Sequence, residues 1–216
     1  MKIVAFYTWC YDIGRTNYGQ ILQCYAMQEI IRHLGFEPLL IKYRKPCKDE
    51  YIQHLDVDSR IEYEKNYRIK KIEGELNGRI KGFFDFIENR IISTSPLYSE
   101  AEIINATKEV EAYLLGSDQL WAPQWFDPVT LFEFVDSTRK ISYATSGIED
   151  KTPQGKEACR KIAEGIEGFK DVSVREHYGR KILEKYTETK IHEVLDPTLL
   201  LSKERSEEHT SELQSH

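Results

Sequence analysis

Short apolar runs alternate along this chain with segments in which apolar residues recur at three- and four-residue steps. Residues 3–8 are a β-rich apolar run, and residues 38–43 are a second one. Between them, residues 19–34 carry apolar side chains at helical spacing, and Gly35 follows where that helix should end. The pattern predicts a strand, a helix and a parallel strand joined by a right-handed crossover.

The same alternation continues through the rest of the sequence. Residues 51–89 indicate a long amphipathic helical region, broken near Gly74 or Gly78. Two further helices are predicted, one over residues 153–169 and a short one that ends at Leu183. Four further strands are predicted: one ends at Leu115, and the others lie at 140–147, at 171–176 and near 194–195. Alternating strands and helices predict an α/β protein with a Rossmann-like parallel sheet.

Polar segments follow the predicted strands, where an open parallel sheet binds its ligands. Each also has a plain structural interpretation, such as a helix start, close packing or a turn. In chain order they are N-Y-G-Q at 17–20, G-S-D-Q-L-W at 116–121, Y-A-T-S-G at 143–147, S-V-R-E at 173–176 and L-D-P-T at 195–198.

Two of these segments carry side chains suited to chemistry. Ser117 and Asp118 follow the apolar run 112–115, and they either cap a short helix or face a ligand, while Trp121 either packs in the core or offers a ring face. Arg175 ends a valine-rich strand and therefore needs a partner or a ligand. Glu176 could pair with it, and a guanidinium at this place could equally bind a phosphate or carboxylate.

Composition and charge exclude several classes of protein. The 216 residues carry a formal net charge of -6 with a pI near 5.6, which argues against a nucleic-acid or anionic-membrane binder. The four cysteines form no C-x-x-C pair and have no histidines at ligand spacing, so we expect free thiols and no metal site. No signal peptide or transmembrane stretch is visible, and we expect a cytoplasmic protein that needs no cofactor.

Taken together and in order, the five segments resemble the polysaccharide pyruvyl transferase family, over residues 1 to about 203. The resemblance implies two Rossmann-like domains facing across a cleft, as in B-type glycosyltransferases. It also implies transfer of pyruvate from phosphoenolpyruvate onto a saccharide as a ketal, in the biosynthesis of cell-surface polysaccharides. The acceptor would be a saccharide or a lipid-linked saccharide.

The resemblance assigns roles to residues of this sequence. Ser173, Arg175 and Glu176 would bind phosphoenolpyruvate on the side of the second domain. Asp118 would hydrogen-bond or deprotonate a sugar hydroxyl as the catalytic group. The remaining residues expected to contact the acceptor on the first domain are Asn17, Gly19, Ser117, Gln119 and Trp121.

The resemblance also divides the chain into residues 1–168, a Rossmann-like acceptor domain, and residues 169–204, the start of a donor domain. Residues 205–216 lack apolar periodicity and look like translated sequencing adapter, although a natural tail is the alternative. We therefore expect an incomplete second domain that lacks the family's general-acid histidine, because His177 and His192 lie in no matching motif. Such a chain would be inactive by itself.

Two other functions fit parts of the pattern. A glycosyltransferase that uses a nucleotide sugar would share the B-type fold, because fold alone does not fix function. A flavodoxin-like binding or regulatory module would use the first four strands. It requires an acidic cluster after the first strand, where residues 9–18 offer only Asp12.

Overall fold

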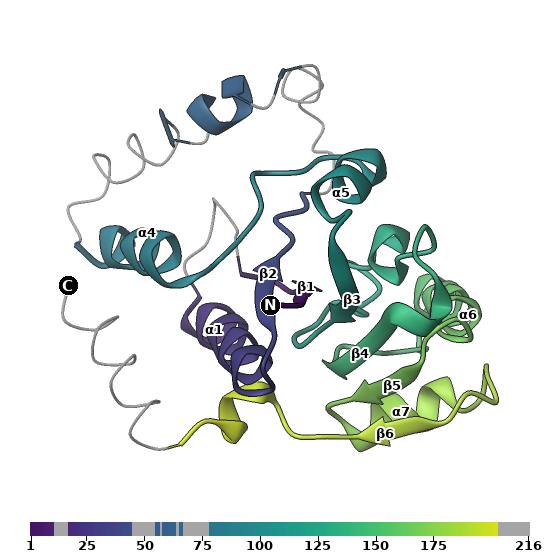
Figure 1. The fold of residues 1–216 in the computed structure, drawn as a ribbon. Helices are drawn as coiled ribbons and strands as arrows, with labels where there is room; N and C mark the ends of the chain where they lie inside the picture. Colours follow the sequence, from purple (N-terminus) through teal and green to yellow (C-terminus); the bar gives the residue numbers. More distant parts are fainter. Residues whose placement is uncertain (11–16, 45–54, 57, 64, 67–77, 203–216) are drawn as a thin grey trace.

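One six-stranded sheet organises the molecule in a computed structural model that describes residues 1–10, 17–44, 55–56, 58–63, 65–66 and 78–202. All strand pairs are parallel, and the order is β2-β1-β3-β4-β5-β6 (Figure 1). The strands are β1 (Ile3–Tyr7), β2 (Glu37–Leu40), β3 (Val110–Leu115), β4 (Lys140–Thr145), β5 (Asp171–Val174) and β6 (Ile191–Glu193). The Rossmann-like α/β fold predicted from the sequence is confirmed.

Helices cover both faces of this sheet. On one face lie α1 (Tyr18–His33) and α4 (Gly78–Arg90), and on the other lie α5 (Glu100–Ala106), α6 (Pro153–Ile166) and α7 (His177–Leu183) (Figure 1). No helix within the described ranges is long and apolar enough to cross a membrane.

The central strand β1 explains why its sequence is a continuous apolar run. Phe6 points into the core formed with α1 and α4, while Ala5 and Tyr7 point into the core formed with α5, α6 and α7. Successive side chains of a strand alternate between faces, so a strand buried on both faces shows no polar positions. This double burial fixes β1 in the middle of the sheet.

Side-chain caps set the starts of the helices. Asn17 accepts a hydrogen bond from the backbone N–H of Gln20 at the start of α1, and Ser99 caps α5 in the same way. Thr152 caps α6, whose first residue is Pro153, a position where proline's missing N–H costs nothing. The helix predicted over 19–34 therefore forms at 18–33.

Several predicted strands extend too far in the sequence analysis. The second strand ends at Leu40 rather than residue 43, because beyond it Lys42 and Arg44 exchange backbone hydrogen bonds with Leu97. The strands predicted over 140–147 and 171–176 end at 145 and 174. The last strand lies at 191–193 instead of 194–195, because its register is set by pairing with β5, and Leu195 is exposed. Apolar character alone does not mark where pairing stops.

The expected helical region at 51–89 is described only in part. Residues 58–63 and 65–66 are helical, and α4 begins at Gly78, one of the two predicted breaks. Gly74 lies outside the described residues. Cys10, Cys24 and Cys159 are buried free thiols as predicted, and Cys47 also lies outside that part of the chain.

Strands β5 and β6 continue the sheet that starts at the N-terminal end of the chain. Val172 pairs with Ser142 of β4 on one side and with Ile191 of β6 on the other. The sheet therefore runs through the boundary that we expected after residue 168, and Arg175 belongs to the same sheet edge as Asp118. Residues 205–216, expected to be a separate tail, lie outside the described residues.

Candidate functional site

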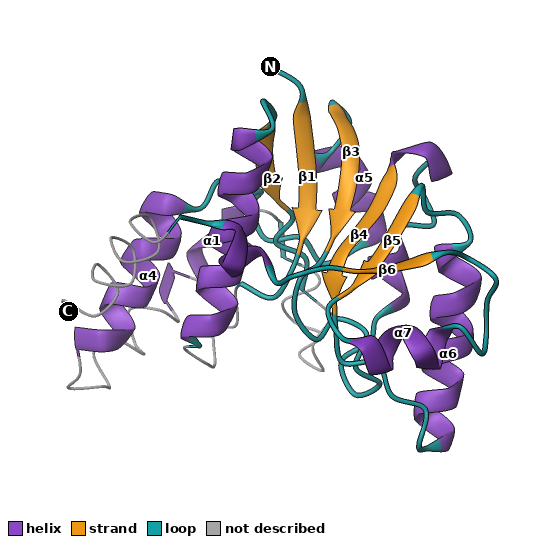
Figure 2. Ribbon diagram, turned by 90° about the horizontal axis from the view of Figure 1, so that it is seen from below, coloured by secondary structure: helices purple, strands orange, loops and turns teal. Residues whose placement is uncertain are grey.

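Polar side chains gather where strands β3 to β6 end. The strands point toward one edge of the sheet, where their connecting loops lie (Figure 2). Because carboxyl ends of parallel strands meet at one edge, segments far apart in sequence become neighbours there. We call these side chains the edge cluster: Ser117, Asp118, Ser146, Arg175, Glu176 and Asp196.

Arg175 lies at the centre of the edge cluster. Its Nε donates to Oε1 of Glu176 at 2.9 Å, its Nη1 to Oδ2 of Asp196 at 3.0 Å, and its Nη2 to Oγ of Ser146 at 2.9 Å. Burial lowers the pKa of Arg175, but the two carboxylates outweigh that effect and raise it. Three of the five guanidinium N–H groups are thus used, and the other two make no hydrogen bond to the residues that the structure describes.

Asp196 connects the ends of β3 and β5. Its Oδ2 accepts from both Arg175 and the Ser117 hydroxyl, the latter at 2.9 Å. Its Oδ1 accepts from the backbone N–H and the hydroxyl of Thr198 at 3.0 and 2.7 Å. Burial raises the pKa of Asp196, but these hydrogen bonds prevail and lower it below the ordinary value. The carboxylate therefore stays ionised and holds two strand ends together.

The turn after β3 has an unusual backbone. Gly116 has φ +118° and Asp118 has φ +75°, in the left-handed region that L residues rarely adopt. A Cβ on Gly116 would lie 2.0 Å from the carbonyl oxygen of Tyr143, so only glycine fits. The buried Ser117 hydroxyl accepts from the Asp118 N–H at 2.7 Å, and the Thr8 hydroxyl donates to the Ser117 carbonyl at 3.0 Å. The turn is held from both neighbouring strands.

This turn presents the Asp118 carboxylate in an unusual environment. Oδ1 accepts from the Gln119 N–H at 2.8 Å, while Oδ2 is buried without a hydrogen-bond partner among the described residues. Burial raises the pKa of Asp118 and the charge of Asp196 adds to it, against the Gln119 N–H and Arg175, which lower it. A hydrogen bond from the Gln20 side chain also lowers this pKa, but burial prevails. A desolvated carboxylate of this kind accepts a proton more readily than an exposed one.

The family profile of polysaccharide pyruvyl transferases matches residues 17–214. The chain belongs to this family. The match covers most of the chain and includes every residue of the edge cluster. Searches of the curated proteins and of the solved structures gave no match.

Not all residues that we expected in the pyruvyl transferase site reach it. Ser173 is buried inside the sheet, where it donates to the Ser142 carbonyl at 2.9 Å and accepts from the Ala144 N–H at 3.2 Å. Trp121 is completely buried in the core, so it offers no ring face to a sugar. The packing interpretation of Trp121 is therefore correct, and Ser173 acts as a support between β4 and β5.

The start of α1 lies on the other side of the Asp118 carboxylate. Asn17 and Gly19 are exposed there, and the Gln20 side chain is close enough to lower the pKa of Asp118. Gln119 is also exposed, next to the carboxylate. The assignment of Asn17, Gly19 and Gln119 to the acceptor stays a prediction.

Sequence reasoning missed two members of the edge cluster. The segment 195–198 is one of the five candidates, but its default interpretation is a turn and no role is predicted for Asp196 itself. Ser146 was grouped with small residues that allow close approach, but its hydroxyl donates to Glu176 at 2.6 Å. Close packing is real at the next residue, where a Cβ on Gly147 would lie 2.8 Å from the Cβ of Ala122.

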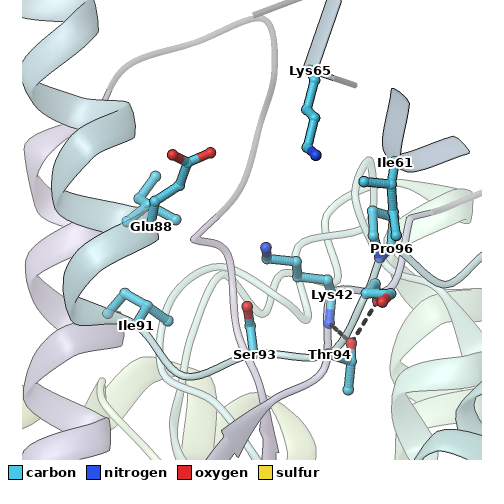
Figure 3. A pocket seen from close by; sticks show the side chains of 10 residues that line it. Lys42, Ile61, Lys65, Glu88, Ile91, Ser93, Thr94 and Pro96 are labelled. Carbon is cyan, nitrogen blue, oxygen red and sulfur yellow. Dashed lines mark hydrogen bonds between the residues drawn. The ribbon is translucent and has the colours of Figure 1, made fainter. Parts of the chain in front are cut away.

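A separate cavity of about 290 Å³ lies between α4 and the helical residues 58–63 and 65–66. Figure 3 shows the side chains of Lys42 and Lys65 directed into it, with Glu88 on the wall formed by α4. At its base, the Thr94 hydroxyl accepts from the Lys42 N–H at 3.1 Å and donates to the Ser95 carbonyl at 2.7 Å. This cavity shares no residue with the edge cluster.

Proposed function

We propose that this chain binds phosphoenolpyruvate and an acceptor saccharide, the two substrates of a transferase that forms a pyruvate ketal on two sugar hydroxyls. Membership of the family supplies the transferase class. The observation that supports the finer assignment is the convergence of Arg175, an anion-binding side chain, and Asp118, a proton acceptor, at one edge of the sheet.

The reaction places defined demands on such a site. The methylene carbon of phosphoenolpyruvate gains a proton and becomes a methyl group, and two hydroxyl oxygens form bonds to the central carbon. The bond from that carbon to the phosphate oxygen breaks, and phosphate leaves. The two hydroxyls lose two protons in all. The new methyl group takes up one proton, and the released phosphate takes up the other and leaves as hydrogen phosphate. The site must therefore bind anions and remove protons from hydroxyls.

Arg175 is our candidate for binding phosphoenolpyruvate. Glu176 and Asp196 hold its guanidinium plane in a fixed orientation, and two N–H groups stay available for a phosphate or carboxylate oxygen. These same carboxylates offset its charge, so one cation faces two anions within the edge cluster. A trianionic donor therefore needs a further cation besides Arg175.

Asp118 is our candidate for the group that removes a proton from the acceptor. Its raised pKa brings it closer to the operating pH of a general base, and the residue is only partly buried. Ser117 fixes the turn, while Asn17, Gly19 and Gln119 provide exposed polar surface for other hydroxyls. Protonation of the vinyl carbon has no such candidate, because the described histidines His33, His177 and His192 make no recorded contact with the cluster.

We therefore propose binding without turnover for this chain. Thermal unfolding is followed with phosphoenolpyruvate, inorganic phosphate, or a uridine or guanosine diphosphate sugar, and phosphate release is measured with a panel of saccharides. Stabilisation by phosphoenolpyruvate without release supports the proposal. Stabilisation by a nucleotide sugar alone would favour a glycosyltransferase instead, and release of phosphate would overturn the claim of inactivity.

A further inference from the structure

Two tryptophans, Trp9 and Trp125, follow β1 and the turn after β3 and contact each other. The side chain of Trp125 is 45% exposed, although tryptophan is highly buried on average. Its ring meets the ring of Trp9 with a centroid distance of 6.4 Å and an interplanar angle of 76°. An edge-to-face contact covers only one face of one of the two rings, and the exposure of Trp125 shows that much of its ring is accessible. We call these two rings the tryptophan platform.

Aromatic side chains of the core pack against the tryptophan platform. The ring of Trp9 lies 6.5 Å from that of the buried Tyr7, which packs edge-on against Tyr43 at 6.1 Å. These contacts hold the rings at the ends of the neighbouring strands β1 and β2. Aromatic side chains have only two rotatable bonds, so a supported platform presents its faces at a low entropic cost.

Trp9 is tied to the turn that carries Asp118. The preceding residue, Thr8, donates its hydroxyl hydrogen to the Ser117 carbonyl at 3.0 Å. The Gln23 amide donates to the Trp9 carbonyl at 2.8 Å and to the Thr8 hydroxyl at 2.7 Å. Because adjacent Cα atoms are about 3.8 Å apart, Trp9 lies within a short reach of Ser117 and its neighbour Asp118.

Trp125 is tied to the same turn from its other side. Its backbone N–H donates to the Ala122 carbonyl at 2.9 Å, and the Ala122 N–H donates to the Gln119 carbonyl at 3.2 Å. Gln119 directly follows Asp118 and donates its own N–H to that carboxylate. The backbone turn that carries Asp118 is thus hydrogen-bonded toward Trp125 on one side and to the residue before Trp9 on the other.

These neighbouring features suit one class of ligand. A pyranose ring carries hydroxyls around its rim and a patch of C–H groups on a face. The C–H groups are weakly positive and apolar, which fits the negative, apolar face of an indole. The hydroxyls fit the exposed side-chain amide of Gln119 in the neighbouring turn.

We propose that the tryptophan platform binds the pyranose ring of the acceptor, with Trp125 against its C–H face. This inference rests on the proposed function, and it names the surface that receives the saccharide. It also moves the stacking role from the buried Trp121 to an exposed tryptophan of the same turn.

Saturation-transfer NMR with the methyl pyranosides of glucose, galactose and mannose tests the inference in the wild type and three variants. We expect transfer to ring C–H protons in the wild type. Trp125→Ala should raise the dissociation constant at least tenfold, and Trp125→Phe should stay within about threefold because a ring face is kept. Tyr63→Ala removes an exposed aromatic ring on the helical residues 58–63 and should change nothing.

Two results would overturn the inference: wild-type affinity in Trp125→Ala, or no binding of any pyranoside to the wild type. Circular dichroism confirms that each variant is folded. Calorimetry with phosphoenolpyruvate is run on the same samples and separates this inference from the proposed function. If phosphoenolpyruvate binds and Trp125→Ala does not weaken saccharide binding, only the role of the tryptophan platform is refuted. If Trp125→Ala weakens saccharide binding but phosphoenolpyruvate does not bind the wild type, only the assignment of phosphoenolpyruvate as the donor is refuted.

Discussion

Arg175 and Asp196 form a 3.0 Å ion pair between residues that follow β5 and β6. The same Asp196 oxygen accepts from Ser117 after β3, so one carboxylate joins three segments that the sequence keeps far apart. Charge-assisted hydrogen bonds of this kind are about twice as strong as neutral ones. The pair therefore organises the sheet edge before any ligand binds.

Replacing Asp196 with asparagine should destabilise the protein by about 1–3 kcal/mol, because it removes charge-assisted bonds to a partly buried guanidinium. Asp136→Asn is a matched control, because Asp136 accepts from the N–H and hydroxyl of Thr138 just as Asp196 does from Thr198. Asparagine caps as well as aspartate, so the control should change stability much less. Urea unfolding at pH 7 measures both, and equal effects would refute the role of the ion pair.

The stabilisation by Asp196 should depend on pH. Its pKa in the folded protein lies below the ordinary value of 3.8, so the ionised carboxylate stabilises the fold at pH values above 3.8. The contribution is lost as the pH falls through the folded pKa. The difference between wild type and Asp196→Asn should therefore be constant near neutrality and shrink below pH 3.8. A constant difference down to pH 2 would contradict this account.

Asp118→Asn should raise the melting temperature at pH 7. The pKa of Asp118 is above 3.8 in the folded protein, chiefly because of burial, so keeping it ionised costs stability at neutral pH. The gain should vanish as the pH falls through the folded pKa and the wild-type carboxyl becomes protonated. Asparagine tolerates φ +75°, whereas Asp118→Ala removes the same charge but adds backbone strain. Scanning calorimetry measures the melting temperatures. A lower melting temperature of Asp118→Asn than of the wild type at pH 7 would contradict the claim that the ionised Asp118 carboxylate costs stability.

Gly116→Ala should destabilise the protein by at least about 4 kcal/mol, because its Cβ would meet the Tyr143 carbonyl at 2.0 Å. Gly35→Ala is the matched control. Gly35 also has a positive φ, +86°, but a Cβ there would meet nothing within 4 Å, so only the backbone cost of about 1–2 kcal/mol applies. Denaturant unfolding of both variants separates the cost of the steric contact from the cost of the backbone conformation. Similar losses of unfolding free energy in the two variants would argue against a close approach of Gly116 to Tyr143.

Cys24 and Cys159 should react slowly with iodoacetamide in the native protein. Burial raises the pKa of Cys159 to about 11 and that of Cys24 well above its ordinary value, so little reactive thiolate exists at pH 8. Peptide mass spectrometry after labelling, with a sample unfolded in urea for comparison, gives the rate for each cysteine. Native labelling as fast as in urea would show that these thiols are accessible.

The sheet was predictable because its strands are buried on both faces. Such strands appear as apolar runs between polar turns, and β1 and β3 both show this pattern. Contacts across the sheet edge were not predictable. The pairing of Arg175 with Asp196 depends on β5 and β6 being neighbours in a fixed register, which no local pattern encodes.

The choice between the two tryptophans after β3 was also beyond the sequence. Trp121 and Trp125 follow the same strand and differ in burial only because of the path of the turn. Trp121 donates its backbone N–H to the Ser146 carbonyl and turns its ring into the core, whereas Trp125 follows the next bend, at Ala122. Periodicity arguments fail in such irregular segments, since no repeating face exists.

The most direct test of the account is a calorimetric titration of phosphoenolpyruvate into the wild type, Arg175→Gln, Arg175→Lys and Arg160→Gln. Arg160 lies exposed on α6, paired with Glu157, and serves as the control. We predict one binding site in the wild type and in Arg160→Gln, and at least tenfold weaker binding in Arg175→Gln. Arg175→Lys should be intermediate because it keeps the charge but loses the bidentate geometry. No binding by the folded wild type, or equal binding by Arg175→Gln, would contradict the account.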